Sequence, residues 1–328
     1  MRSLRLRVAA VKSLRLVPGW SAAVILAVEF LFFTAILWRP GAPHSFANAE
    51  NVALIFKYSG IYGISAIGAA MIIGAGGVDL APGAVMALAS VVTGELFVES
   101  GWPLPAAMGA GLAVGCATGG LAAALVVGAR LPPFIATLGT MGIARGLAFL
   151  ITEGRFYDLS RWLAAGTAPL GLALAAWPGV LMIALAAVFQ AVMTRTAVGR
   201  HVLATGGNET AARYAGVRVN RVKAFVYVAG GALAALSGVV LAVVQGQGKA
   251  DLASGYELDI IAAAVVGGAS LSGGRASVVG AVIGALIFGV LRNALAQIPG
   301  GTFADRLILG VAVLVIVVLD RAAGRREG

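Results

Sequence analysis

Long apolar stretches alternate with short polar loops along almost the whole chain. Most stretches approach the roughly 20 residues that a helix needs to cross a bilayer. They occupy residues 19–38, 52–75, 80–98, 104–128, 134–152, 178–194, 223–245, 258–270, 276–295 and 303–320. The pattern predicts an all-α polytopic membrane protein, one transmembrane domain over residues 1–328 with about ten crossings and some helices broken or re-entrant. Residues 258–270 are too few to cross alone, so an arrangement with eight crossings stays open.

One long polar segment, residues 195–223, interrupts the apolar pattern. Asn208 can cap a short helix over residues 209–215, and Gly216 can end that helix in a left-handed turn. Against one acid, Glu209, the segment carries six basic residues, Arg195, Arg200, Arg213, Arg218, Arg221 and Lys223. A short capped helix held at the membrane surface by basic flanks predicts a docking feature.

The basic residues favour one side of the membrane. If the N-terminus lies inside, the alternating loops place sixteen Lys and Arg residues in the cytoplasm and five outside. Cytoplasmic loops of membrane proteins carry such an excess, so both termini and residues 195–223 are expected in the cytoplasm. The net charge of +10 is therefore interpreted as a consequence of topology rather than as a nucleic-acid-binding surface.

Composition narrows the class further. With 60% hydrophobic and 12% charged residues, the chain has too few polar groups to cover a soluble fold. Its 46 glycines are about twice the usual share and indicate closely packed helices, as in the small-residue spacing of Gly111, Gly115 and Gly119. The single cysteine, Cys116, excludes an intrachain disulfide.

Two glycine-rich interruptions have the same form, GGVDLAPG at residues 76–83 and GGASLSGG at residues 267–274. Transporters contain internal repeats whose helices break near the substrate path, where free backbone groups face a polar cavity. The alternative is that two turns coincide by chance in a glycine-rich protein.

Three charged residues inside or beside apolar runs, Glu29, Arg145 and Asp79, have two interpretations each. Glu29 is a proton-coupling or substrate contact, or it forms an interhelix hydrogen bond, which we favour because an ionised carboxylate in the bilayer costs about 3 kcal/mol. Arg145 lines a path or extends to the outer interface. Asp79 contacts substrate or, as we favour, accepts backbone N–H bonds at a broken helix. Asn293 is a weaker path candidate.

Sequence motifs of catalysis are absent. The chain has no GxxxxGK[ST], no HExxH and no paired carboxylates close to a histidine. We therefore expect no catalytic residues and no metal site, and if ATP is used, another chain binds it.

Four ordered motifs resemble the permease subunits of bacterial ABC importers for simple sugars, the ribose and related monosaccharide group. They are IIGAGGVDLAPGAVMALAS, LPPFIATLGTMGIARGLAFLITEGR, ATGGNETAARYAGVRVNRVKAF and GYELDIIAAAVVGGASLSGGRASVVGAVIGALIFGVLRNAL, and the likeness covers roughly residues 45–320. The resemblance implies a multi-pass permease domain of the bacterial cytoplasmic (inner) membrane, with residues 195–223 as its cytoplasmic coupling loop.

The resemblance also implies partners and sites. The permease would pair with a second copy or homologue in the lipid bilayer, with an ABC ATPase that binds ATP and Mg, and with a periplasmic or extracellular sugar-binding protein. It would bind no cofactor itself. The implied ATPase-coupling residues are Gly207, Asn208, Glu209, Arg213 and Gly216. Candidates for the translocation path are Gly76, Gly77, Asp79, Phe134, Thr137, Arg145, Gly267, Gly268 and Asn293.

One departure from the family pattern and two alternatives remain. Where the family commonly has Ser-Val, this chain has Ala81 and Pro82, which removes a hydroxyl and a backbone donor. An ion-coupled secondary carrier would use Glu29 and Asp79 as coupling sites. The branched-chain amino-acid permeases share the coupling layout, but the GGVDL stretch and the paired glycines before Asn208 favour the sugar branch.

Overall fold

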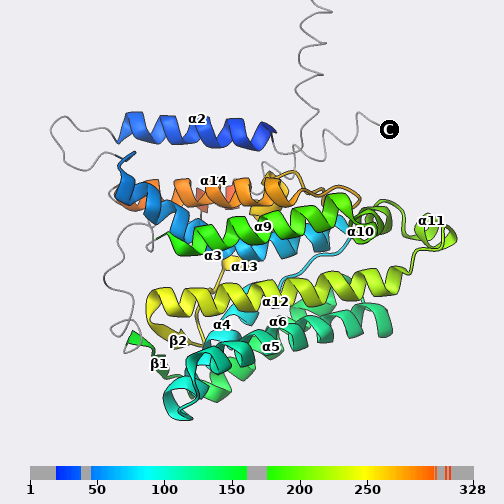
Figure 1. The fold of residues 1–328 in the computed structure, drawn as a ribbon, viewed down its shortest axis with the longest axis horizontal. Helices are drawn as coiled ribbons and strands as arrows, with labels where there is room; N and C mark the ends of the chain where they lie inside the picture. The colour runs from blue at the N-terminus through cyan, green and yellow to red at the C-terminus, as the bar shows by residue number, and fades with distance from the viewer. Residues whose placement is uncertain are drawn as a thin grey trace, which may run out of the picture.

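The computed structural model describes residues 20–37, 46–160 and 176–298, together with a few positions after residue 299. Helices run side by side, with α2 at one edge of the molecule and α5 and α6 at the opposite edge (Figure 1). In chain order they are α2 (Trp20–Ile36), α3 (Ala49–Gly74), α4 (Pro82–Gly94), α5 (Leu104–Ala123), α6 (Pro133–Thr152), α9 (Trp177–Arg195), α10 (Ala197–Gly207), α11 (Glu209–Tyr214), α12 (Val219–Gln245), α13 (Tyr256–Val266) and α14 (Val278–Gln297). Short π-helices extend α4 over Glu95–Glu99 and α5 over Ala124–Gly128.

Within the described residues, seven helices are long and apolar enough to cross a membrane. Helix α2 has 17 residues and α13 has 11. At 1.5 Å per residue, α13 spans about 16 Å, which confirms that this segment is too short to cross alone. Most of the predicted segment 303–320 and both chain ends lie outside the described residues, so the ten crossings and the cytoplasmic termini stay predictions.

A two-stranded ribbon departs from the all-α expectation. Strands β1 (Phe156–Asp158) and β2 (Gln247–Lys249) pair antiparallel, with Tyr157 opposite Gly248. They lie at the end of the bundle opposite α10 and α11 (Figure 1). Three residues per strand leave too little apolar alternation to predict such a ribbon from sequence.

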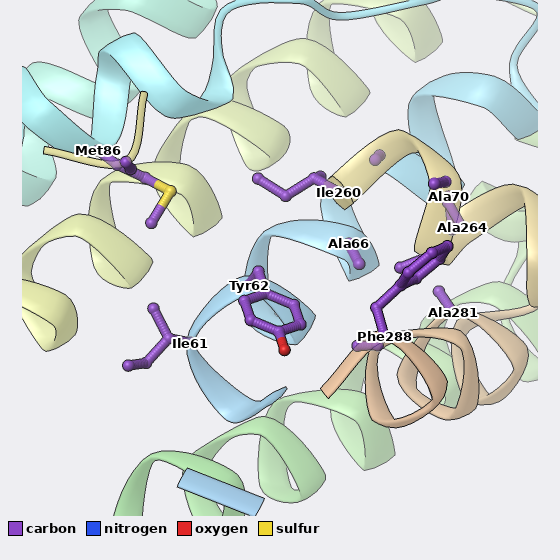
Figure 2. Packing of buried hydrophobic residues seen from close by; sticks show 14 of the residues in the cluster. Ile61, Tyr62, Ala66, Ala70, Met86, Ile260, Ala264, Ala281 and Phe288 are labelled. Atoms are coloured by element: carbon purple, nitrogen blue, oxygen red, sulfur yellow. The ribbon is translucent and has the colours of Figure 1, made fainter. Parts of the chain in front are cut away.

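Helix α3 forms the centre of the bundle, because every residue from Ser59 to Gly74 is buried. Its side chains Ile61, Tyr62 and Ala66 meet residues from α4, α13 and α14, among them Met86, Ile260 and Phe288 (Figure 2). Helix α5 packs on α12 through its glycines, since a Cβ added at Gly115 would lie 2.5 Å from the Gly231 carbonyl oxygen. The predicted role of the small-residue spacing in packing is thereby confirmed.

Both glycine-rich interruptions separate helices. Residues 75–81 form an irregular segment between α3 and α4, and residues 267–277 form one between α13 and α14. The Asp79 carboxylate accepts a hydrogen bond of 2.8 Å from the Ala81 N–H, which confirms the structural interpretation of Asp79. Pro82 begins α4, where the missing backbone donor costs nothing because the first turn leaves its N–H groups unbonded.

Candidate functional site

The polar segment folds as the sequence predicts. The Asn208 side chain accepts a hydrogen bond of 2.9 Å from the Ala211 N–H, and Gly216 has φ = 83°. These two residues close α11 at Glu209–Tyr214, one residue shorter than expected. Both capping predictions are confirmed, because the sequence supplied an N-cap acceptor and a residue that tolerates a left-handed backbone.

Glu209 joins α11 to the start of α12. Its carboxylate lies 2.6 Å from Lys223 Nζ and 2.8 Å from Arg213 Nη2, and Arg213 also donates to the Asn220 side chain at 3.0 Å. Hydrogen bonds from Lys223 and then Arg213 hold the pKa of Glu209 below its usual range. The ion pairs fix the direction in which the six-residue helix leaves the bundle.

The most exposed large side chain of α11 is Tyr214, at 91%. Sequence reasoning selected the caps and charges of this helix and missed the tyrosine. Aromatic side chains concentrate in protein–protein interfaces, where they provide large rigid contact areas. An aromatic residue in a short polar helix between two membrane spans was the available signal.

Helix α10 ends against both glycine-rich interruptions. The Gly274 N–H donates to the Gly74 carbonyl at 3.1 Å, so the interruption after α13 is bonded to the end of α3. A Cβ added at Gly206 would clash with the Gly74 carbonyl and lie 2.6 Å from Gly274 N. We call the contact of Gly74, Gly206, Gly273 and Gly274 the glycine junction.

The glycine junction links distant parts of the chain. Gly273 has φ = 82°, and a Cβ there would lie 2.5 Å from the Gly206 carbonyl oxygen and 3.0 Å from Gly76 Cα. Gly206 stands two residues before the Asn208 cap. Side chains at these positions would separate backbones that now touch, so α10, which leads directly into α11, is in backbone contact with the segments leading into α4 and α14.

The structure brings some path candidates together. Gly76 has φ = 80° and lies at the glycine junction, and a Cβ at Gly77 would lie 2.6 Å from Tyr227 Oη. Thr137 is fully buried. Its hydroxyl donates a hydrogen bond of 2.9 Å to the Pro133 carbonyl and lies 3.4 Å from the Val78 carbonyl oxygen. Asp79 is buried at the same interruption.

The other path candidates lie apart from this group. Gly267 is buried against Gly280, Gly268 is exposed with φ = 99°, and Phe134 is exposed on α6. Arg145 donates to the carbonyls of Ala250 and Leu252 at 2.6 and 2.9 Å, which fixes the segment leading into α13. Asn293 accepts a hydrogen bond of 2.9 Å from Gln297, which also donates to Asn51.

Two further charged sites lie within the apolar runs. Arg292 Nη2 lies 2.6 Å from the Asp259 carboxylate, whose side chain is 1% exposed, and the Arg292 guanidinium lies 5.4 Å from the Tyr256 ring centre. Sequence reasoning missed this ion pair between α13 and α14, because it treated Arg292 only as a charge within a span. Glu29 Oε2 is buried without a hydrogen-bond partner in the described part of the chain, so the interhelix bond favoured for it is not seen there.

Residues 51–318 match the family model described as "Branched-chain amino acid transport system / permease component". The chain belongs to this permease family. Named relatives match the permease over most of its length, and no solved structure matches it. It is 33% identical over 289 residues to the ribose import permease protein of Haemophilus influenzae. The matched residues make up 86% of this chain and 88% of that protein.

Two other relatives broaden the comparison. The D-allose transport system permease protein of Escherichia coli K12 is 32% identical over 302 residues, 90% of each chain. The autoinducer 2 import system permease protein of Enterobacter sp. 638 is 33% identical over 306 residues, 91% of the permease and 85% of that protein. The family description names branched-chain amino acids, whereas these relatives are named for other substrates. A family model covers more proteins than a single relative does. The names of the relatives are therefore the more specific guide to the class of substrate.

The permease's described residues contain no group of three or more His, Cys, Asp or Glu side chains that could hold a metal ion. Its relatives are named as permease proteins. The described geometry offers a capped helix with an exposed aromatic residue, attached to the glycine junction.

Proposed function

We propose that this permease is the membrane subunit of an ATP-driven importer that carries a monosaccharide across the bacterial cytoplasmic membrane. The observation that carries the proposal is the match, at about one third identity over most of the chain, to permeases named for ribose and D-allose. The capped helix α11 supports it, because a membrane subunit without a nucleotide motif needs a surface through which an ATPase acts.

In the proposed complex, α11 docks in the ATPase subunit, with Tyr214 as its aromatic anchor. Gly207, Asn208, Glu209, Arg213 and Gly216 hold the helix in position for docking. ATP and Mg would be bound by the ATPase, and the permease would pair with a second copy or homologue. A sugar-binding protein would deliver the substrate at the β1–β2 end.

Movement of α11 would reach the bundle through the glycine junction. Because Gly206 touches the segments leading into both α4 and α14, a displacement of α10 acts on the two interruptions together. Closely packed backbones transmit a rigid-body displacement, since they have no side chains to deform between them. Asp79 and Thr137, which lie beside the first interruption, are the path candidates that such a movement would reach first.

Reconstitution in vesicles tests the proposal. The permease is combined with its ATPase and its sugar-binding protein, and uptake of radiolabelled ribose is compared with uptake of leucine. We expect ribose uptake that requires ATP and is unaffected when the proton gradient is collapsed. Uptake without the ATPase that follows the proton gradient would identify a secondary carrier, and ATP-dependent uptake of leucine alone would assign the permease to the amino-acid branch.

A further inference from the structure

A polar pocket of about 560 Å³ lies beside α11, between the turn that joins α5 to α6 and the first turn of α12. Its polar side chains come from Arg130 on the turn, Glu209 and Arg213 on α11, and Asn220 and Lys223 on α12. Both helices that the turn connects are candidate membrane spans, Leu104–Gly128 and Pro133–Thr152. The pocket therefore lies at the depth where a bilayer has its headgroups.

The lining carries an excess of positive charge. Three cationic side chains, Arg130, Arg213 and Lys223, face one carboxylate, Glu209, which leaves a net charge of +2. Lys223 donates one hydrogen bond to the Glu209 carboxylate. The hydrogen bonds that Arg213 donates to described residues come from Nη2 alone. An ammonium has three donors and a guanidinium five, so both side chains retain donors for a further acceptor.

Arg130 strengthens the case for an anionic ligand. Its backbone is left-handed at φ = 56°, and its side chain makes no hydrogen bond or ion pair with the described residues. Left-handed backbone is unfavourable for a residue other than glycine, asparagine or aspartate. The turn thus places a guanidinium at the pocket with all its donors available.

Exposed apolar side chains follow in the chain directly after Arg130, and the first of them, Leu131, lines the pocket. Leu131 is 37% exposed, and Phe134 and Ile135 on the first turns of α6 are each 55% exposed. A ligand that matches this surface has a compact anionic group next to hydrocarbon. Basic pockets beside transmembrane helices on the cytoplasmic side bind the headgroups of anionic lipids.

We propose that the pocket binds the phosphate of an anionic phospholipid, with its acyl chains lying along the Phe134 and Ile135 face of α6. The phosphate shares Lys223 and Arg213 with Glu209, so the lipid joins α11 to the bilayer surface. The inference requires only that α5 and α6 span a membrane. It does not depend on the transported substrate.

Native mass spectrometry of the purified permease tests this site without ATPase or sugar. The permease is mixed with equal amounts of phosphatidylglycerol and phosphatidylcholine. We expect selective retention of phosphatidylglycerol, reduced about five- to tenfold in Arg130→Gln, since one cation near an anionic lipid contributes roughly 1 kcal/mol. The control is Arg221→Gln, which removes an exposed cation of the same polar segment outside the pocket and should retain phosphatidylglycerol fully.

Several outcomes would overturn the proposal. Equal retention of the two lipids, or an equal loss in both variants, would mean that no specific site exists. Displacement of the lipid by an excess of inorganic phosphate would point to a soluble phosphate as the ligand. If Arg130→Gln binds lipid normally but binds the ATPase subunit more weakly, an acidic side chain of the ATPase occupies the pocket. Size-exclusion profiles that match the unmodified permease establish that both variants are folded.

Discussion

The Asp259–Arg292 ion pair holds the short helix α13 against α14 inside the bundle. Because the Asp259 carboxylate is almost fully buried, removing either charge breaks an ion pair that is largely shielded from water. We expect Asp259→Asn to destabilise the protein by about 3–5 kcal/mol. The change is measured as a lowered melting temperature in detergent.

The matched test of this prediction is the double variant Asp259→Asn, Arg292→Gln. It removes both charges and should recover part of the stability that the single variant loses. A double variant as unstable as the sum of the single variants would show that the two charges do not stabilise each other.

The ion pairs of Glu209 make the order of α11 dependent on pH. Because Lys223 and Arg213 lower the pKa of this carboxyl in the folded protein, protonation opposes folding of α11. The stabilisation is complete above the pKa of the unfolded chain and is lost as pH falls through the lower pKa of the folded state. We expect hydrogen-exchange protection of α11 to decrease in that acidic range.

Glu209→Gln should have the lower protection at neutral pH, since glutamine carries no charge for Lys223 and Arg213 to pair with, and the difference from the native protein should vanish once Glu209 is protonated. The side chain of Glu209 is 40% exposed, so salt should weaken the native protection as well. Protection in the native protein that is equal to that of Glu209→Gln at neutral pH would refute the role of the ion pairs.

At the scale of elements, the glycine junction predicts a coupling defect. In Gly206→Ala the new methyl group would clash with the Gly74 carbonyl and Gly274 N, so α10 must move away from both interruptions. In reconstituted vesicles we expect ATP hydrolysis to continue while sugar uptake falls about tenfold. A tenfold fall corresponds to a loss of about 1.4 kcal/mol in the coupling free energy between ATP hydrolysis and transport.

Gly120→Ala in α5 is the control for Gly206→Ala, because a Cβ there meets no atom within 4 Å. Alanine also has the higher helix propensity, so this variant should transport normally. Normal uptake by Gly206→Ala would contradict transmission through the junction.

Helix α11 predicts a second defect, in docking rather than in transmission. Tyr214→Ala removes the exposed aromatic side chain and should weaken binding of the ATPase subunit about thirtyfold, the loss of roughly 2 kcal/mol typical of an interface anchor. Binding is measured by surface plasmon resonance on permease in nanodiscs. Trp102→Ala, an exposed aromatic change before α5, is the control and should leave binding unchanged. An equal loss in both variants would argue against docking on α11.

At the scale of the whole molecule, local features were predictable and long-range contacts were not. Each predicted apolar segment within the described residues corresponds to a helix, because the length of an apolar run is a local property. The Asn208 and Gly216 caps are local as well. By contrast, Gly206, Gly74 and Gly274 are far apart in sequence, and their meeting depends on how the helices pack. Nothing in the local pattern pairs Asp259 with Arg292 either.

The same distinction applies to the path candidates. The repeated glycine pattern indicated two interruptions, and the structure contains both. Their shared form did not reveal that they touch each other and α10. Their role in translocation stays a prediction, as does that of Phe134, Arg145 and Asn293, because lining a path is a property of the assembled transporter and not of the local sequence pattern.

Orientation in the membrane is a property of the whole molecule, and labelling in cells tests it. The ribbon of β1 and β2 and the helix α11 lie at opposite ends of the bundle (Figure 1), so they should be accessible from opposite sides. With Cys116 replaced by serine, Thr210→Cys on α11 or Phe156→Cys on β1 provides a single thiol at an exposed position. The excess of basic residues predicts that α11 lies in the cytoplasm. A membrane-impermeant maleimide should therefore label Phe156→Cys in intact spheroplasts and Thr210→Cys only in inverted vesicles. The reverse labelling would invert the orientation and place α11 beyond the reach of a cytoplasmic ATPase, which would refute the proposed coupling together with the topology.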